Sequence, residues 1–216
     1  MPTSMNQPIQ RRLTAADVGA AAEVLARAFV HDPLWCYLFP EPGQRAALVL
    51  QAFRAFAPSL IADAVALGVG APLEGVAVWS PPDKAPPQPG ALLSPGLLTL
   101  AFGPFLAALP RAAPIFSRFE ALQRRHAPEP HYYLSIVGVV PGAQGRGLAS
   151  ALIRPVLAQA DARGLTAYTE TMTPENVPLY QHYGFVVREE APVAAGELRI
   201  WALQRPRLAD SVAGRP

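Results

Sequence analysis

A glycine-rich run in the last third of the chain has the residue types of an anion-binding loop. Residues 141–150 read Pro-Gly-Ala-Gln-Gly-Arg-Gly-Leu-Ala-Ser, and a helical pattern begins at Leu148. Glycines let backbone N–H groups approach a ligand closely, and the first turn of a helix adds unpaired donors and a dipole that favours an anion. The guanidinium of Arg146 is able to add a charge-assisted hydrogen bond. The run therefore predicts a site for a phosphate or pyrophosphate group.

Two phosphate-binding patterns compete for this loop, and the first is that of a dinucleotide-binding fold. Gly145-Arg-Gly147 resembles the start of G-x-G-x-x-G, and Glu170 follows at about 20 residues, where that pattern has a ribose-binding carboxylate. Against it, Ser150 stands where the third glycine belongs, residues 141–144 lengthen the loop, and too little chain follows for the usual sheet. The dinucleotide interpretation is the weaker of the two.

The second pattern is better matched, because the loop resembles the acetyl-CoA loop of the GNAT superfamily. Residues 144–149, Gln-Gly-Arg-Gly-Leu-Ala, fit that family's Gln/Arg-x-x-Gly-x-Gly/Ala signature and follow Val139-Val140-Pro141. Glu170, Asn176 and the run Tyr180-Gln-His-Tyr-Gly-Phe185 then come in the family's order. Order and spacing together identify the chain as resembling a GNAT N-acetyltransferase.

Within the superfamily, residues 131–203 are most similar to puromycin N-acetyltransferase-like members, while the N-terminal half agrees loosely. Two departures matter. Ala149 replaces a common glycine, which is within the pattern, and the spacing from Asn176 to Tyr180 is shorter than in many members.

The resemblance implies an α/β GNAT fold with a mixed, mostly antiparallel sheet and helices on both faces. Two parallel central strands are expected to splay apart, so that the pantetheine arm of acetyl-CoA pairs with the backbone of the first strand. A backbone N–H there would also stabilise the oxyanion formed on the thioester carbonyl. No metal is implied. The cofactor-binding residues that the resemblance implies are Val137, Gly138, Val139, Gln144, Gly145, Arg146, Gly147, Leu148, Ala149, Ser150, Asn176 and Tyr180.

The same resemblance implies that a primary amine of a small molecule attacks the thioester of acetyl-CoA directly. Glu170, at a strand end beside the splayed site, is expected to accept the proton of the amine, with a bridging water if needed. Tyr180 is expected to protonate the departing thiolate.

Each of these residues also has a structural interpretation. Gly145 and Gly147 can form a turn into a helix, Tyr180 can pack in the core, and Asn176 can cap a helix that begins at Val177. Glu170 can be a solvated strand-end carboxylate, or it can bind the acceptor instead of acting as the base.

Two other functions stay open at the level of the sequence. A non-catalytic acyl-CoA-binding regulatory module would keep the loop without productive chemistry, and the presence of both Glu170 and Tyr180 argues against it. A protein N-terminal acetyltransferase would need an open groove for a peptide, whereas the prolines and helices expected in residues 81–130 favour a covered site.

The elements that must position these residues alternate along the chain. Strands are predicted at Ile9–Leu13, Gly75–Ser80, Tyr132–Val140, Leu165–Met172, Phe185–Arg188 and Leu198–Leu203. Helices are predicted after a Thr14 cap, at Gln44–Val65 with a kink at Pro58, and at Leu97–Leu109, Ala113–His126, Gly147–Ala162 and Val177–Tyr183. The Asp32-Pro33 pair is expected to end the first helix, residues 66–70 have no assignment, and residues 81–95 are expected to form a long surface loop. The strand-helix-strand order from Tyr132 to Met172 predicts a parallel pair with a crossover helix.

Composition indicates one buried core. The 216 residues are 51% apolar and 16% charged, and we expect one domain at 9–205 between a flexible N-terminus, 1–8, and a flexible tail, 206–216. A net charge of +2 is too small to argue for nucleic acid as a partner.

The remaining observations bear on the cell compartment and on metals. Cys36 is the only cysteine, so an intramolecular disulfide is impossible, and His126, His131 and His182 lack metal-ligand spacing. No signal-like run is found at the N-terminus and no apolar stretch of about 18 residues lacks a proline, glycine or charge. We expect a cytoplasmic protein without a membrane partner, and a homodimer stays open.

Overall fold

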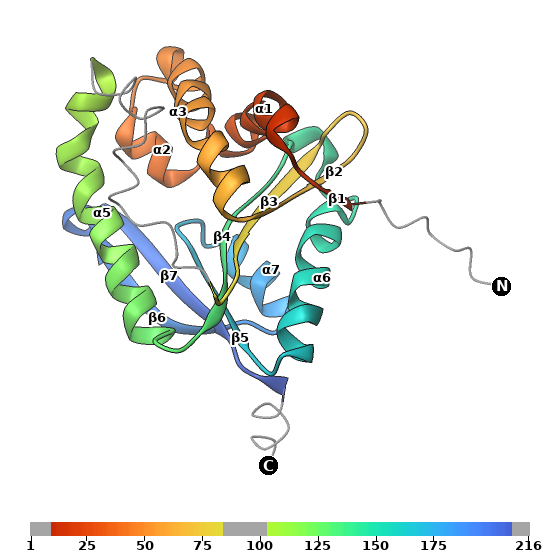
Figure 1. Ribbon diagram of the computed structural model, residues 1–216. Coiled ribbons are helices and arrows are strands. Elements are labelled where there is room, and N and C mark those ends of the chain that lie inside the picture. Colours follow the sequence, from red (N-terminus) through yellow and green to blue (C-terminus); the bar gives the residue numbers. More distant parts are fainter. Residues whose placement is uncertain (1–9, 84–102, 209–216) are drawn as a thin grey trace.

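A seven-stranded sheet in the order β1-β2-β3-β4-β5-β7-β6 organises the protein (Figure 1). The computed structural model describes residues 10–83 and 103–208. Its strands are β1 (Gln10–Arg12), β2 (Val65–Val69), β3 (Gly75–Ser80), β4 (His131–Val139), β5 (Thr166–Thr171), β6 (Val186–Val193) and β7 (Leu198–Arg205). Neighbouring strands are antiparallel except β4 and β5, which are parallel. The predicted mixed, mostly antiparallel sheet with one parallel pair is confirmed.

Helices cover both faces of this sheet, as predicted. They are α1 (Val18–Phe29), α2 (Pro33–Leu38), α3 (Pro42–Asp63), α5 (Pro104–His126), α6 (Leu148–Ala162) and α7 (Asn176–His182), with short 3-10 turns at η1 (Ala15–Asp17), η3 (Pro141–Ala143) and η4 (Ala194–Gly196). A Cβ at Gly138 would meet Ala28 of α1 at 2.9 Å, whereas a Cβ at Gly75 would meet Leu152 of α6 at 3.3 Å. Because Gly75 pairs with Val139 and successive strand residues face opposite sides, α1 and α6 lie on opposite faces.

The start of α2 is a feature that the sequence interpretation missed. The Asp32-Pro33 pair not only follows the end of α1 but also begins the next helix, because the Asp32 carboxylate accepts a hydrogen bond from the N–H of Leu34 at 3.0 Å. Proline suits the first helical position because its missing N–H would have no partner there. A second unassigned segment, residues 66–70, lies mostly in β2, which forms an antiparallel hairpin with β3.

One helix replaces two predicted ones. Residues 104–126 form the continuous α5, although Pro110 and Pro114 lie inside it and Pro110 was expected to separate two helices. A proline removes one hydrogen bond of the helix, but the buried Ile115 and Leu122 pack on the strand face of β7 and hold the chain in register.

Several predictions fall wholly or partly outside the described residues. They concern residues 84–95 of the expected surface loop, residues 97–102 of an expected helix, the N-terminus at 1–8, and positions 209–216 of the tail.

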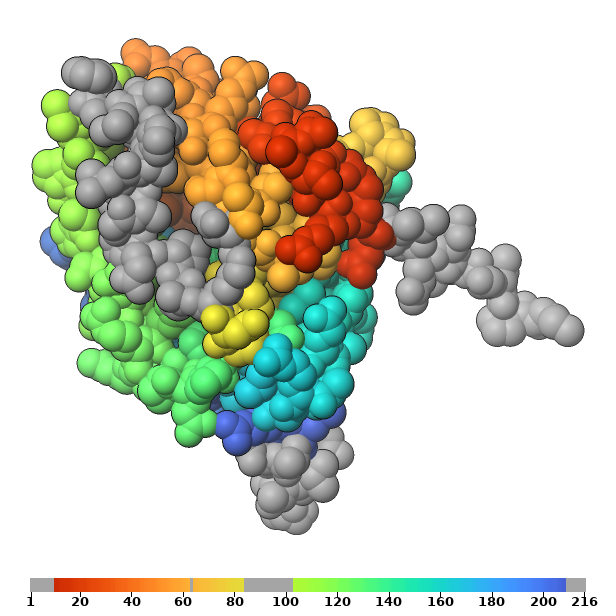
Figure 2. Space-filling model, in the orientation of Figure 1, coloured from red at the N-terminus to blue at the C-terminus, as the bar shows by residue number. Residues whose placement is uncertain are grey.

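The long helix α3 packs against α1, and the two form one continuous surface (Figure 2). It buries Val49, Ala52, Phe53 and Ala57 in the core. Over Pro42–Ala62 this helix is also long and apolar enough to cross a membrane, judged by length and composition. In this structure one side of α3 is buried and the helix packs against α1, as expected of a helix that covers one face of a sheet.

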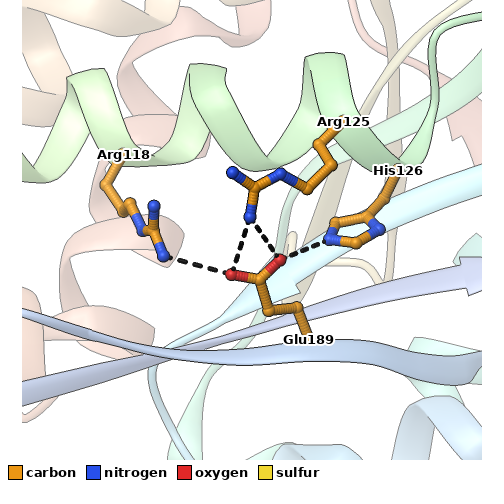
Figure 3. Close-up of polar contacts among 4 residues, drawn as sticks. All are labelled: Arg118, Arg125, His126 and Glu189. Carbon is orange, nitrogen blue, oxygen red and sulfur yellow. Dashed lines mark hydrogen bonds and ion pairs between the residues drawn. The ribbon is translucent and has the colours of Figure 1, made fainter.

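The carboxylate of Glu189 on strand β6 contacts three basic side chains of α5 (Figure 3). Its Oε1 accepts a hydrogen bond from Arg118 at 3.1 Å and its Oε2 one from Arg125 at 2.9 Å, while Nε2 of His126 lies 2.8 Å from Oε2. The hydrogen bonds from His126 and Arg125 lower the pKa of the Glu189 carboxyl group. This cluster joins residues more than sixty positions apart, so it supports the helix that covers β6 and β7.

Replacing Glu189 by glutamine is expected to lower the free energy of unfolding at pH 7 by up to about 1 kcal/mol, because a partly exposed ion pair is weak. Since the folded-state pKa is lowered, the contribution is present above the ordinary pKa of a glutamate and is lost as the pH falls below about 4. Urea unfolding at pH 7 and pH 3.5 checks this. Glu190→Gln, which removes the single exposed pair with Arg199, is the control and should cost less. An equal loss for both variants, or one independent of pH, would contradict the prediction.

Candidate functional site

Strands β4 and β5 part in the middle of the sheet. Their parallel register runs from His131↔Thr166 to Leu134↔Thr169 and ends there, although β4 continues to Val139. At the parting point the Thr169 hydroxyl donates to the Leu134 carbonyl at 2.9 Å. The side chain of Thr169 thereby satisfies a buried carbonyl where the ladder ends.

A bulge in β4 accompanies this parting. Val78 pairs with Ile136 and Trp79 with Leu134, so Ser135 is an extra residue without a partner in β3. Its hydroxyl donates to the Val78 carbonyl at 3.0 Å. A bulge bends and twists a strand, and here it directs the second half of β4 away from β5. The predicted splaying of two central parallel strands is confirmed.

A cleft of about 640 Å³ opens at this point. Its walls come from the end of α1 and the start of α2, the end of β4, the loop and first turn of α6, and α7. The lining residues are Ala28, Phe29, His31, Asp32, Pro33, Val137, Gly138, Val139, Ala143, Gln144, Gly145, Gly147, Leu148, Ala149, Ser150, Thr173, Glu175, Asn176, Leu179, Tyr180 and Tyr183.

The glycine-rich loop lies along one wall of the cleft with two left-handed residues. Gly145 has φ +75° and Gly147, the N-cap of α6, has φ +77°. No atom lies within 4 Å of a Cβ built at either position, so the requirement for glycine is conformational and not one of space. The first N–H groups of α6 have no partner within the helix, and their dipoles favour an anion at this wall.

Every predicted cofactor-binding residue except Arg146 lines this cleft. The Arg146 guanidinium instead donates to Glu74 at 2.8 Å, a residue of the turn between β2 and β3. Because Glu74 lies 72 positions earlier, nothing local to the loop predicts this ion pair. The expected contact of Arg146 with a pyrophosphate stays a prediction, and it would require this exposed ion pair with Glu74 to be exchanged or shared.

Gln144 and Asn176 both make contacts that the sequence interpretation did not foresee. The Gln144 amide donates to the Val139 carbonyl at 3.3 Å. Asn176 is the first residue of α7, behind Glu175 as N-cap, and its amide donates to the Thr171 hydroxyl at 3.4 Å. The interpretation of Asn176 as a cap for a helix beginning at Val177 is wrong.

Tyr180 is buried and also lines the cleft, so it belongs both to the core and to the site. Its ring meets Phe185 edge-on at 5.9 Å between centroids. Burial raises the pKa of Tyr180 to about 12, against a hydrogen bond with Thr169, and the charges of Asp32 and Glu170 raise it further. The phenol is therefore a proton donor at neutral pH.

Glu170 lies on β5 just beyond the parting point and is not among the residues that line the cleft. Burial raises its pKa to about 8, while the hydroxyls of Tyr168 and Tyr133 oppose this rise. Its Oε1 is shielded from solvent, and neither this atom nor the Tyr168 hydroxyl makes a well-formed hydrogen bond with a described side chain. The residue as a whole is half-buried, so Glu170 is less exposed than a fully solvated strand-end carboxylate, and its role as base or acceptor ligand stays a prediction.

Asp32 and Thr173 are two polar residues of the site that the sequence interpretation missed. Asp32 lines the cleft, and Thr173, from the segment between β5 and α7, donates its hydroxyl to Asp32 Oδ2 at 3.3 Å. Burial raises the pKa of Asp32, against the hydrogen bonds from Leu34 and Thr173. The Asp32-Pro33 pair is a sequence signal for the start of a helix, but the position of Asp32 in the cleft depends on the tertiary structure.

Comparisons with known proteins agree with this geometry. The model of the acetyltransferase (GNAT) family matches residues 115–185, which include the parted strands, the loop and Tyr180. An uncharacterized N-acetyltransferase from Schizosaccharomyces pombe is 28% identical over 192 residues, 83% of this chain and 74% of the relative.

Two solved structures superpose over nearly the whole chain. A histone acetyltransferase HPA2 and related acetyltransferase from Corynebacterium glutamicum has a TM-score of 0.65 at 23% identity, covering 93% of this chain and 97% of the other. Arylalkylamine N-acetyltransferase 2 from Aedes aegypti has a TM-score of 0.62 at 15% identity, covering 93% and 99%. At these identities the structures establish a common fold. The chain thus has the GNAT fold, and its residues 115–185 are similar to the acetyltransferase (GNAT) family.

Proposed function

We propose that this protein transfers the acetyl group of acetyl-CoA to a primary amine of a small molecule. The observation that carries the proposal is the cleft itself, which joins a phosphate-binding loop to the parted strands and to a buried, protonated Tyr180. The similarity to puromycin N-acetyltransferase-like members extends the proposal to an amino-acid-like or aminonucleoside amine. We place the reaction in the cytoplasm, without nucleic acid or membrane as a partner.

The binding of CoA is supported by two features of the cleft. The lining part of the loop, residues 144–150 without Arg146, carries no carboxylate, so no negative side chain of the loop would repel an anion bound to its backbone N–H groups. Beyond Leu134 the β4 edge no longer pairs with β5, which leaves polar backbone groups at Val137–Val139 for the amide groups of a pantetheine arm.

The chemistry needs one proton acceptor and one proton donor. The amine loses a proton and attacks the thioester carbon, the new C–N bond forms, and the C–S bond breaks as the thiolate leaves. Tyr180 supplies a proton to the thiolate from within the cleft. Glu170 takes the proton of the amine through a bridging water, because its carboxylate does not line the cleft. The presence of both Glu170 and Tyr180 argues against a non-catalytic acyl-CoA-binding module.

The experiment that tests the function is a thiol-release assay with acetyl-CoA and a panel of small amines, puromycin included, with calorimetry of CoA on the same sample. Release of CoA that depends on an amine supports the proposal. Tight binding of CoA without turnover on any amine favours the non-catalytic module, and the absence of CoA binding contradicts both.

Gly147→Asp is expected to weaken CoA binding at least about tenfold, because it places a negative charge beside the phosphates and a side chain at a positive φ. Calorimetry measures the change in Kd. Gly164→Asp is the matched control, since Gly164 also has a positive φ (+61°) and free space but follows the far end of α6. Equal Kd values for wild type and Gly147→Asp would refute the assignment of the loop.

Tyr180→Phe is expected to lower kcat about 100-fold while leaving the Kd of CoA within a factor of about two, because it removes only the acidic proton. Steady-state kinetics and calorimetry measure the two quantities. Tyr132→Phe, whose hydroxyl accepts a hydrogen bond from Arg163 away from the cleft, should retain full kcat. Full activity of Tyr180→Phe would remove this residue as the acid.

If Glu170 is the base, kcat/KM should rise with pH through about 8 and then level off, because the raised pKa keeps the carboxyl protonated below that value. In Glu170→Gln this limb should disappear and the rate above pH 8 should fall about 100-fold. Both proteins are compared with one amine, so that the titration of the acceptor is common to the two profiles. An unchanged limb in Glu170→Gln would leave Glu170 without a role as base.

A further inference from the structure

The charges in the cleft are divided between its two ends. The loop end offers backbone donors, whereas the end formed by α1, α2 and α7 carries His31, Asp32 and Glu175. Among the described residues that line the cleft, none is a lysine or an arginine. The end that faces Tyr180 is therefore suited to a cation and not to a further phosphate.

Asp32 is the most buried carboxylate at that end, and its hydrogen-bonding capacity is only half used. Oδ1 accepts from the Leu34 N–H at 3.0 Å and Oδ2 from the Thr173 hydroxyl at 3.3 Å. An ionised carboxylate accepts about four hydrogen bonds, so each oxygen keeps a free lone pair. Within residues 10–83 and 103–208 no basic side chain forms an ion pair with it.

The surroundings of Asp32 favour a ligand that carries positive charge. Burial raises the pKa of this carboxyl group, so the hydrogen bonds from Leu34 and Thr173 compensate only part of the cost of burying the ionised form. Asp32 and Tyr180 both line this cleft, and the negative charge of Asp32 raises the pKa of Tyr180. An ammonium group bound at Asp32 would lie beside the residue that is proposed to protonate the thiolate.

We propose that Asp32 binds the ammonium group of the acceptor and that Thr173 positions the Asp32 carboxylate for this contact. The inference rests on the proposed function and narrows its substrate class to amines that are cationic at neutral pH. Asp32 is an acceptor-binding residue here, and Thr173 acts through it. The hydrogen bond between them joins the α1–α2 segment to the β5–α7 segment, so the acceptor end is assembled from two distant parts of the chain.

The test uses the most active primary amine of the panel and its O-substituted hydroxylamine analogue, in which oxygen replaces the CH₂ next to nitrogen. This analogue is a nucleophile of the same shape but is uncharged at neutral pH. Asp32→Asn keeps an oxygen able to accept from Leu34 and removes the charge. We expect it to raise KM for the cationic amine at least about tenfold, to change KM for the neutral analogue less than about twofold, and to leave the Kd of CoA unchanged.

Two further variants separate charge recognition from a structural role. Glu41→Gln, at the N-cap of α3 and outside the cleft, should leave both KM values unchanged. Thr173→Val should raise KM for the cationic amine, and Thr173→Ser, which keeps the hydroxyl, should restore it.

The outcomes distinguish this inference from the proposed function. Failure of the wild-type protein to release CoA with any amine contradicts the proposed function. If the wild type is active, an unchanged KM for the cationic amine in Asp32→Asn overturns the inference alone. Equal increases for the charged and neutral acceptors, or weakened CoA binding, also overturn it, because they would indicate that Asp32 only caps α2.

Discussion

The site depends on the loss of pairing between two adjacent strands in the middle of a sheet. Buried backbone N–H and C=O groups need partners, so a sheet cannot part without compensation. Here the Thr169 hydroxyl donates a hydrogen bond to the carbonyl of Leu134, the last residue of the β4–β5 ladder. The bulge at Ser135 turns β4 away from β5, and the Ser135 hydroxyl donates to the Val78 carbonyl. Beyond these two contacts the edge of β4 is open to a ligand with amide groups. The loop, α6 and α7 all lie around the opening that this parting creates.

The opening has two regions that differ in their hydrogen-bond donors and ionisable groups. Backbone donors of the loop and of the first turn of α6 favour an anion, and no carboxylate lines that wall. Toward the parted strands, burial raises the pKa values of Tyr180 and Glu170 to about 12 and about 8. Burial of ionisable groups costs free energy of folding, and perturbed pKa values gather where a protein performs proton transfer. The polarity along the cleft is the reason for the proposal of an anionic donor at one end and a cationic acceptor at the other.

Much of the fold could be predicted because local pattern and global packing agree over β4, α6 and β5. Apolar alternation, a glycine at the N-cap of α6 and a crossover helix leave few topologies for this segment. Agreement was poorer where packing outweighed local signals. Pro110 predicts the end of a helix, yet α5 continues because Ile115 and Leu122 are buried on β7. The segment 66–70 is too short and too rich in glycine to be assigned from its sequence, and most of it forms a strand through pairing with β1 and β3.

Short-range spacing and resemblance to a known family were enough to predict the strands and helices from β4 to α7, the glycine-rich loop and Tyr180. Tertiary structure alone decided which side chains share the cleft. It turned Arg146 toward Glu74, enclosed Glu170 with Tyr133 and Tyr168, and brought Asp32 to Thr173 across 141 positions. These are contacts between distant segments, and the direction of a side chain and the burial that shifts its pKa exist only after the whole chain has packed.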